Sequence, residues 1–296
     1  MIARLNELAD KVIPQTAEQT IRACRSSDGT STDTQQMNKT LPAVLIDALA
    51  QTIRAGKPVQ ALRMIDDCWP ELDGQGASFA ACVFERIQFS NPVLNEARFA
   101  NCRFVSCRFS HAELADVRFE DCSFAGQDGK GCSFAFSNLQ RAAFIACDLP
   151  LAAFDRTELF AVEMRDCNLT GAKFTKVDFS RALSRKKIET RAGFHACKMD
   201  LADLSEAKLP GCSLAGSRLR EADLSGADLT DADLSNCDLF QAMLDGAKLS
   251  GADLTGAEVS GLKLTTLADF AGLRISDDQM FRLLDAMGVS VRVRER

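Results

Sequence analysis

The sequence contains no tyrosine, a single tryptophan and only two histidines among its 296 residues. His111 and His195 stand apart from any cluster of cysteine or acidic residues at metal-ligand spacing, so we expect no metal site. The sequence also lacks a glycine-rich phosphate loop, and it singles out no nucleophile with an accompanying base. We therefore predict a protein that is not an enzyme and that needs no cofactor.

Long apolar runs and an excess of positive charge are missing too. Nowhere do 18 consecutive apolar residues occur, and residues 1–15 lack the apolar run and cleavage site of a secretory signal. The formal net charge is −6, which disfavours a generally basic nucleic-acid-binding surface. We expect a cytoplasmic protein that binds neither a membrane nor nucleic acid directly.

What the chain does have is a five-residue period. From Phe79 to Leu264, steps of five visit 38 positions, of which 35 are Phe, Leu, Met or Val. The residue two places earlier is Ala, Cys, Ser, Thr, Val or Pro at 34 of the same 38 steps. Neither the 3.6-residue period of a helix nor the two-residue period of a long strand fits this pattern. The chain must turn every five residues, with one large and one small inward residue in each repeat.

The period also accounts for most of the 12 cysteines. Cysteine is a small and readily buried residue, so it replaces alanine at a tight inward position without any redox role. We predict that the cysteines at this position are structural. They are Cys82, Cys102, Cys107, Cys122, Cys132, Cys147, Cys167, Cys197, Cys212 and Cys237.

The segments on either side of the repeat differ from it, and we divide the chain into residues 1–76, 77–267 and 268–296. The first segment predicts a small helical prefix with a helix over 2–12, a polar linker over 26–36, and helices over 41–55 and 59–69. This prefix either caps the first repeats or carries a separate interaction. We favour the cap because the segment has no catalytic or basic signature.

The last segment predicts an end cap. Ser276 and Gln279 have capping-box spacing, and a helix with one apolar face follows and stops at Gly288. Unprotected solenoid ends invite association with other chains, so this helix and the short strand after it serve as a simple cap or as a self-complementary dimer contact. The candidate dimerisation residues are Met280, Leu283, Leu284, Met287, Val289 and Val291.

The repeat fails twice, and both failures are candidate loops. The two inward positions break together in residues 126–131 and again in about residues 182–193. Segments that leave a rigid scaffold are often binding sites, although a tolerated insertion explains the break equally simply. The candidate partner contacts in these loops are Gln127, Asp128, Lys130, Arg185, Lys186, Lys187 and Arg191.

Charge is spread unevenly along the repeat. Residues 77–199 contain 17 Lys and Arg against 14 Asp and Glu, whereas residues 200–267 contain 5 against 12. Six outward acids directly precede the large inward residue. One interpretation is that these carboxylates imitate DNA phosphates. The other is that they only solvate the surface and accept hydrogen bonds from turn amides. Because duplex DNA has one charge per about 1.7 Å, this net charge falls short of a full DNA mimic. The six acids are Asp203, Asp223, Asp228, Asp233, Asp238 and Asp253.

Four segments carry a resemblance to a known family. They are GKGCSFAFSNLQRAAFIACDLPLAAF after the first break, EMRDCNLTGAKF, IETRAGF at the second break, and QMFRLLDAMGVSV near the end. In order, over about residues 79–291, they resemble the Qnr quinolone-resistance branch of the pentapeptide-repeat proteins. The first loop is shorter and the second longer than in that branch, and the prefix has no counterpart there.

This resemblance implies a fold and a function. The fold is an all-β solenoid, a right-handed quadrilateral β-helix with about twenty residues in each coil. The function is non-enzymatic binding of DNA gyrase and topoisomerase IV by a homodimer, through projecting loops and partial DNA mimicry, with protection from quinolones. Protection from another topoisomerase poison stays open, as does a different class of function, a scaffold or effector that binds another protein.

Overall fold

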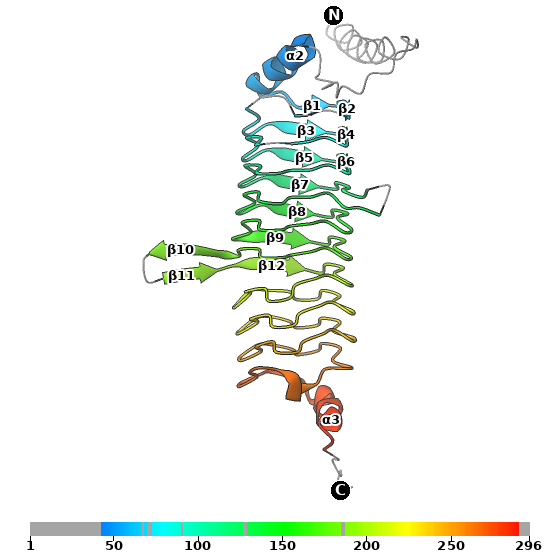
Figure 1. Cartoon of the computed structure of the whole chain (residues 1–296), viewed down its shortest axis with the longest axis vertical. Helices are drawn as coiled ribbons and strands as arrows, with labels where there is room; N and C mark the ends of the chain where they lie inside the picture. Colours follow the sequence, from blue (N-terminus) through cyan, green and yellow to red (C-terminus); the bar gives the residue numbers. More distant parts are fainter. Residues whose placement is uncertain are drawn as a thin grey trace, which may run out of the picture. The chain divides into compact units, whose positions relative to one another are not determined.

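Each five-residue repeat forms one flat face, and four faces close one coil of a β-solenoid (Figure 1). This computed structural model describes residues 43–66, 68–69, 73–89, 91–126, 129–184 and 187–289. In it, Phe79 pairs with Phe99, and Phe99 pairs with Phe119. Partners are thus twenty residues apart, which is four repeats. The predicted all-β solenoid is confirmed.

Two faces of the solenoid carry parallel sheets. The first face holds a seven-stranded sheet, and the second face holds a three-stranded one. The remaining faces are joined by isolated parallel bridges, such as that between Asp203 and Asp223. In order, the first sheet contains β1 (Val59–Gln60), β3 (Ser78–Ala80), β5 (Arg98–Ala100), β7 (Arg118–Glu120), β8 (Ala143–Ile145), β9 (Val162–Arg165) and β12 (Ala192–His195), and the second contains β2 (Arg63–Ile65), β4 (Val83–Glu85) and β6 (Arg103–Val105).

The large inward residues form columns along the axis. The ring centroids of Phe79 and Phe99 are 4.8 Å apart, and those of Phe99 and Phe119 are 5.0 Å apart. Because neighbouring strands lie about 4.8 Å apart, identical rings in successive coils stack face to face. These residues are fully buried, which explains why the large position of the repeat accepts almost nothing but Phe, Leu, Met and Val.

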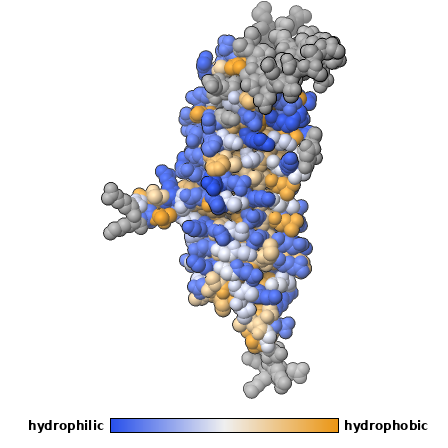
Figure 2. All heavy atoms as spheres, viewed as in Figure 1, coloured by the Kyte–Doolittle hydropathy of each residue, from blue (hydrophilic) through white to orange (hydrophobic). Residues whose placement is uncertain are grey.

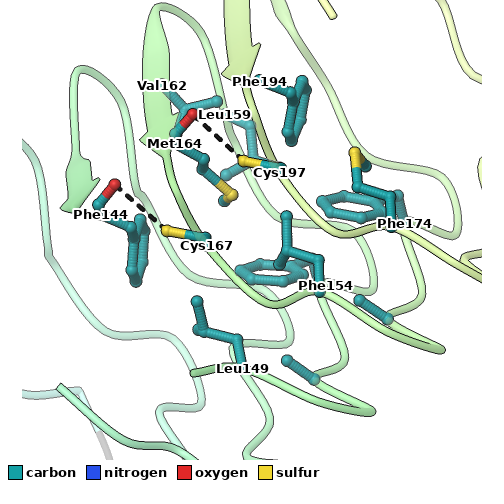
Figure 3. Close-up of a cluster of buried hydrophobic side chains, with 14 of the residues drawn as sticks. Phe144, Leu149, Phe154, Leu159, Val162, Met164, Cys167, Phe174, Phe194 and Cys197 are labelled. Carbon is teal, nitrogen blue, oxygen red and sulfur yellow. Dashed lines mark hydrogen bonds between the residues drawn. The ribbon is translucent and has the colours of Figure 1, made fainter. Parts of the chain in front are cut away.

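The cysteines form a column of their own. Six successive coils place Cys82, Cys102, Cys122, Cys147, Cys167 and Cys197 in line, all buried. Each thiol donates to the backbone carbonyl oxygen of the large inward residue on the first face one coil earlier, as Cys167 does to Phe144 at 3.4 Å and Cys197 does to Met164 at 3.3 Å (Figure 3). The inward position predicted from sequence agrees with this burial. The structure adds that these cysteines are hydrogen-bond donors rather than simple fillers.

The N-terminal end corrects one prediction and confirms another. A helix over residues 59–69 is wrong, because this segment contains β1 and β2 and forms the first coil, with Trp69 buried and stacked on Phe89 at 5.2 Å. The solenoid therefore begins well before Ala77. The helix expected over 41–55 is present as α2 (Ala43–Arg54), and its Leu49 packs into the solenoid core as a cap. The expected helix over 2–12 lies outside the described residues.

The C-terminal end is closed by a short helix. After a 3-10 turn, η1 (Leu264–Thr266), strand pairing continues as far as Arg274, beyond the expected boundary at residue 267. The helix α3 (Asp277–Ala286) then begins with the predicted capping box, in which the amide of Ser276 donates to Oε1 of Gln279 at 2.7 Å. The buried Gln279 also donates to the carbonyl oxygens of Leu254 and Ala257, so α3 closes the last coil. In the part of the chain that the structure describes, no helix is long and apolar enough to cross a bilayer.

Candidate functional site

Both breaks in the repeat are insertions of whole multiples of five residues. Where the sheet register normally advances by twenty, it advances by 25 from Phe119 to Phe144 and by 30 from Met164 to Phe194. The coils thus contain five and ten extra residues. The inward phase is the same before and after each insertion, which is why the period in the sequence resumes unshifted.

The two ends of the first insertion lie close together. A Cβ atom on Gly126 would lie 1.8 Å from the carbonyl oxygen of Lys130, and one on Gly131 would lie 2.3 Å from the backbone of Leu151. Only glycine allows the two ends of the loop, Gly126 and Lys130, to approach so closely, and only glycine lets residue 131 lie against the backbone of the next coil. Lys130 is exposed. Gln127 and Asp128 lie outside the described residues.

The second insertion is a β-hairpin that projects from the solenoid (Figure 1). It consists of β10 (Ser180–Ser184) and β11 (Lys187–Thr190), which pair antiparallel. Its apolar side chains are unusually exposed, with Leu183 at 48% and Ile188 at 71%. Lys187 is exposed in β11, whereas Arg185 and Lys186 lie outside the described residues.

The hairpin bounds differ from the loop expected over 182–193. Ala192 and Gly193 are buried in β12, so they belong to the scaffold. Arg191 returns the chain to the solenoid: its amide donates to the carbonyl of Phe179 at 3.1 Å, and its carbonyl accepts from the amide of Ala161 at 2.7 Å. The exposed side chain of Arg191 therefore lies at the base of the hairpin, at the corner of the solenoid. Beside it, the guanidinium of Arg181 lies 5.9 Å over the ring of Phe160.

The two insertions leave diagonally opposite corners of the solenoid. The first follows Phe124 on the second face, and the second follows Phe179 on the fourth face. Figure 1 accordingly shows the loop after β7 and the β10–β11 hairpin on opposite sides. One flat partner surface cannot contact both insertions through a single face.

The six predicted phosphate-mimicking acids are spread over all four faces. Only Asp203 with Asp223 and Asp233 with Asp253 are paired in the same column. Every one of the six accepts a hydrogen bond from the amide two residues later, as Asp223 does from Ser225 at 2.9 Å. Asp228, Asp238 and Asp253 also form ion pairs with basic side chains. Bonding turn amides, the simpler of the two sequence interpretations, is what the geometry shows.

Known proteins show the same architecture. Two family models, both described as pentapeptide repeats, match residues 75–128 and residues 137–175, 163–183, 197–236 and 232–266. The chain belongs to the pentapeptide-repeat family. Among solved structures, a trypsin-treated variant of QnrB1, described as a plasmid-mediated fluoroquinolone resistance protein, aligns with a TM-score of 0.64 and 24% identity over 79% of this chain and 100% of its own.

Full-length QnrB1 aligns similarly with this pentapeptide-repeat chain. The TM-score is 0.57, and the alignment covers 78% of this chain and 100% of QnrB1 at 24% identity. At this level of identity the likeness shows a shared fold. No curated protein sequence matches the chain.

Beside the hairpin, the pentapeptide-repeat scaffold contains a charged cluster that the sequence analysis missed. Oε2 of Glu163 lies 3.6 Å from Nε2 of His195 and 3.5 Å from the guanidinium of Arg165. A Cβ on Gly193 would come within 2.7 Å of both the carboxylate and the imidazole, so a larger residue there would displace these two side chains. Within the described ranges, no group of three or more Cys, His, Asp or Glu side chains is arranged to hold a metal ion.

The inward thiols of Cys212 and Cys237 lack the chemistry of a reactive site. Burial raises the pKa of Cys212 to about 11 and that of Cys237 to about 12. These groups stay protonated at neutral pH, and the thiolate is the nucleophile and the metal ligand. Their role is therefore structural.

The predicted dimerisation residues separate into two groups. Leu283 is buried in the solenoid core, so it serves the cap, and Leu284 is half-buried. Met280 at 40%, Met287 at 40% and Val289 at 46% are exposed and remain candidates for an interface. Val291 lies outside the described residues.

Proposed function

We propose that this pentapeptide-repeat protein binds a type II DNA topoisomerase, DNA gyrase or topoisomerase IV, without being an enzyme, and protects it from quinolones or other poisons of the cleavage complex. The observation that carries the proposal is the pair of in-phase insertions on a rigid solenoid whose fold matches that of a fluoroquinolone resistance protein. The proposed complex contains a homodimer in the cytoplasm. Its subunits meet through Met280, Met287 and Val289.

The β10–β11 hairpin is the main proposed contact. Its sequence from Arg181 to Arg191 carries five basic residues and one acidic residue, and its apolar side chains project into solvent. A basic arm with exposed Leu183 and Ile188 fits an acidic protein surface that offers an apolar pocket. The six outward aspartates contribute at most a partial mimic of DNA, because they are shared among four faces and three of them are ion-paired.

A supercoiling assay with purified gyrase and a quinolone tests the proposal. We expect the protein to restore supercoiling at intermediate concentrations and to inhibit gyrase at high concentrations. If neither rescue nor inhibition appears at any concentration, with gyrase or with topoisomerase IV, the topoisomerase proposal fails.

The register supplies clean deletion variants for the same assay. Removing residues 181–190 joins Ser180 to Arg191, which restores a twenty-residue coil because the extra ten residues are gone. Removing residues 126–130 restores the first coil in the same way. We expect the hairpin deletion to abolish rescue while thermal unfolding stays unchanged. Unchanged rescue would show that the hairpin has no part in the mechanism.

A further inference from the structure

Below the first insertion, the same corner of the solenoid carries a row of exposed apolar side chains. We call Leu151, Leu201, Phe240 and Met243 the apolar edge; their exposed fractions are 45%, 59%, 38% and 49%. Backbone hydrogen bonds from Leu151 to Thr170 and from Leu201 to Arg220 place these residues along one corner. Figure 2 shows apolar patches on the flank below the loop.

The two leucines of the apolar edge are not explained by the fold. Leu151 has a φ of 57° and Leu201 a φ of 59°, a left-handed conformation that Gly, Asn and Asp adopt more readily. Between them in the column stands Gly171, and the side chain of Leu151 lies over it. Large apolar side chains that are both conformationally disfavoured and half exposed point to a function outside the fold.

Charges differ on the two sides of the apolar edge. On one side, Arg218 pairs with Asp200 and Arg220 pairs with Asp238, and the Arg220 guanidinium also lies 5.5 Å over the ring of Phe240. Lys198 lies in the same column as Arg218 and Asp238, so this flank has one positive charge more than negative. On the other side, the column that runs from Lys173 through Asp203 and Asp223 to Met243 has one negative charge more than positive, and no described residue forms an ion pair with either aspartate. The edge therefore has a slightly basic flank and a slightly acidic one, and the acidic flank faces the end at Met243.

The spacing of the apolar edge matches an α-helix lying along the solenoid axis. Leu151 and Leu201 are two coils apart, and Leu201 and Phe240 are again two coils apart. Two coils span about 9.6 Å, and seven residues of a helix span about 10.5 Å. Apolar residues at every seventh position of a helix would thus meet successive members of the edge.

We propose that the apolar edge is a docking site for an amphipathic α-helix of a partner protein, with apolar residues at heptad spacing and basic residues along the flank that faces Asp203 and Asp223. This binding mode needs neither the β10–β11 hairpin nor a topoisomerase. It therefore goes beyond the proposed function and is tested separately from it.

The test uses a synthetic helical peptide of about 21 residues with leucines at every seventh position and lysines along one flank. We expect it to bind the full chain in fluorescence anisotropy at least about tenfold more tightly than a scrambled peptide of the same composition. Leu201→Asn is expected to weaken binding about tenfold. The matched control is Phe136→Asn at another left-handed corner, where the ring is 48% exposed, and it should leave the affinity unchanged.

Two further measurements separate docking from a structural role. Because Asn adopts a positive φ more readily than Leu, Leu201→Asn should unfold at the same or a higher temperature. Asp223→Asn keeps an oxygen for the amide of Ser225 but loses the charge, so binding should weaken about threefold at low salt and less at high salt. A lower unfolding temperature for Leu201→Asn, or equal binding of both peptides, would overturn the proposal. Two other results would also overturn it. If the peptide binds only after residues 1–38 are removed, the occupant of the apolar edge is that segment of the same chain. If Leu201→Asn dissociates a dimer, the occupant is a second copy of the chain.

Discussion

The two halves of the solenoid build the same coil from different chemistry. In the coils from β1 to β12, the aromatic half, the large inward residues are mostly Phe, and these coils contain all ten strands of the two sheets. The coils after β12 are the leucine half. After β12 the large inward residues are Leu except for Met199 and Val259, and the coils are joined by isolated bridges. A five-residue repeat thus fixes the coil but leaves open how the core and the turns are stabilised.

The turns that follow the first face show the difference most clearly, whereas on the fourth face the amide three residues later closes the turn in both halves, as in Leu94 and Leu229. In the first half, carbonyls such as that of Phe99 accept from the thiol of a cysteine in the next coil, here Cys122 at 3.4 Å. In the second half, the carbonyl of Leu234 accepts from the amide three residues later at 3.2 Å, and Asp233 bonds the amide of Ser235. Cysteine is therefore common where no amide of the turn donates to the carbonyl of the large inward residue. Aspartate is common where the backbone amides of the turn donate to that carbonyl and to the aspartate side chain.

The functional features follow the same division. Both insertions leave the aromatic half, where sheets flank them on the first face. The outward aspartates and most of the apolar edge belong to the leucine half. We infer that the aromatic half is the stiffer base for the projecting loops, whereas the leucine half carries its exposed acidic and apolar residues directly on the coils.

The largest expected effect comes from emptying the aromatic core. Phe104 has six aromatic neighbours with ring centroids at 4.8–6.4 Å, so Phe104→Ala should lower the free energy of unfolding by about 4–5 kcal/mol. Leu234→Ala in the leucine half should cost about 3 kcal/mol, because no ring contacts are lost there. Urea titration and hydrogen exchange measure the free energy of unfolding of the two variants. A larger loss for Leu234→Ala would contradict the idea that the aromatic half is stiffer.

The cysteine column should show a smaller effect that depends on the donor. Cys122→Ala removes the donor to Phe99 and should lower the free energy of unfolding by about 1–2 kcal/mol, whereas Cys122→Ser keeps a donor and should cost less. Ser217 already makes the equivalent bond to Phe194 at 2.9 Å. In the leucine half, Cys237→Ala should cost below about 1 kcal/mol, since its acceptor Leu214 also receives the amide of Ser217. Equal losses for the two alanine variants would show that cysteine acts only by filling space.

Opposite substitutions at left-handed corners, one in each half, should change stability in opposite directions. Gly211 has a φ of 67° and open space around its absent Cβ, so Gly211→Ala should destabilise the fold by about 1 kcal/mol through backbone conformation alone. Ala146 has a φ of 51° at a corner of the aromatic half, and Ala146→Gly should be neutral or stabilise by up to about 1 kcal/mol. Thermal unfolding of both variants measures this contrast. The same direction in both would mean that corner strain is not the controlling factor.

Much of this architecture was predictable, and the failures have physical causes. The period, the inward cysteines, the capping box at Ser276 and the positions of both insertions follow from which residues fit a closed coil. The first coil was missed because Val59, Met64 and Trp69 keep the five-residue spacing without Phe or Leu. The apolar edge was not predicted because corner side chains such as Leu201 do not pack into the core, so the period leaves their identity free.

The smallest expected effect concerns how each half holds its carboxylates. Bidentate hydrogen bonds from Arg141 lower the pKa of Asp116 below its ordinary 3.8 in the aromatic half. At the end of the leucine half, bonds from the hydroxyl and amide of Ser260, followed by Arg282, lower the pKa of Glu258 below its ordinary 4.5. Both groups therefore contribute stability above those ordinary values, and the contribution is lost as the pH falls through the lowered folded values.

Salt distinguishes the two carboxylates. At about 1 M salt the screening length is about 3 Å, so the attraction from the exposed Arg141 weakens while the neutral donors of Ser260 are little affected. Carboxylate NMR titrations at low and high salt should show the pKa of Asp116 rising towards 3.8 and that of Glu258 moving less. Arg141→Gln provides the control, because it should bring the pKa of Asp116 near its ordinary value at either salt concentration. An equal salt response for both groups would mean that Arg282, rather than the turn, holds Glu258, and that the two halves share one mechanism at their surfaces.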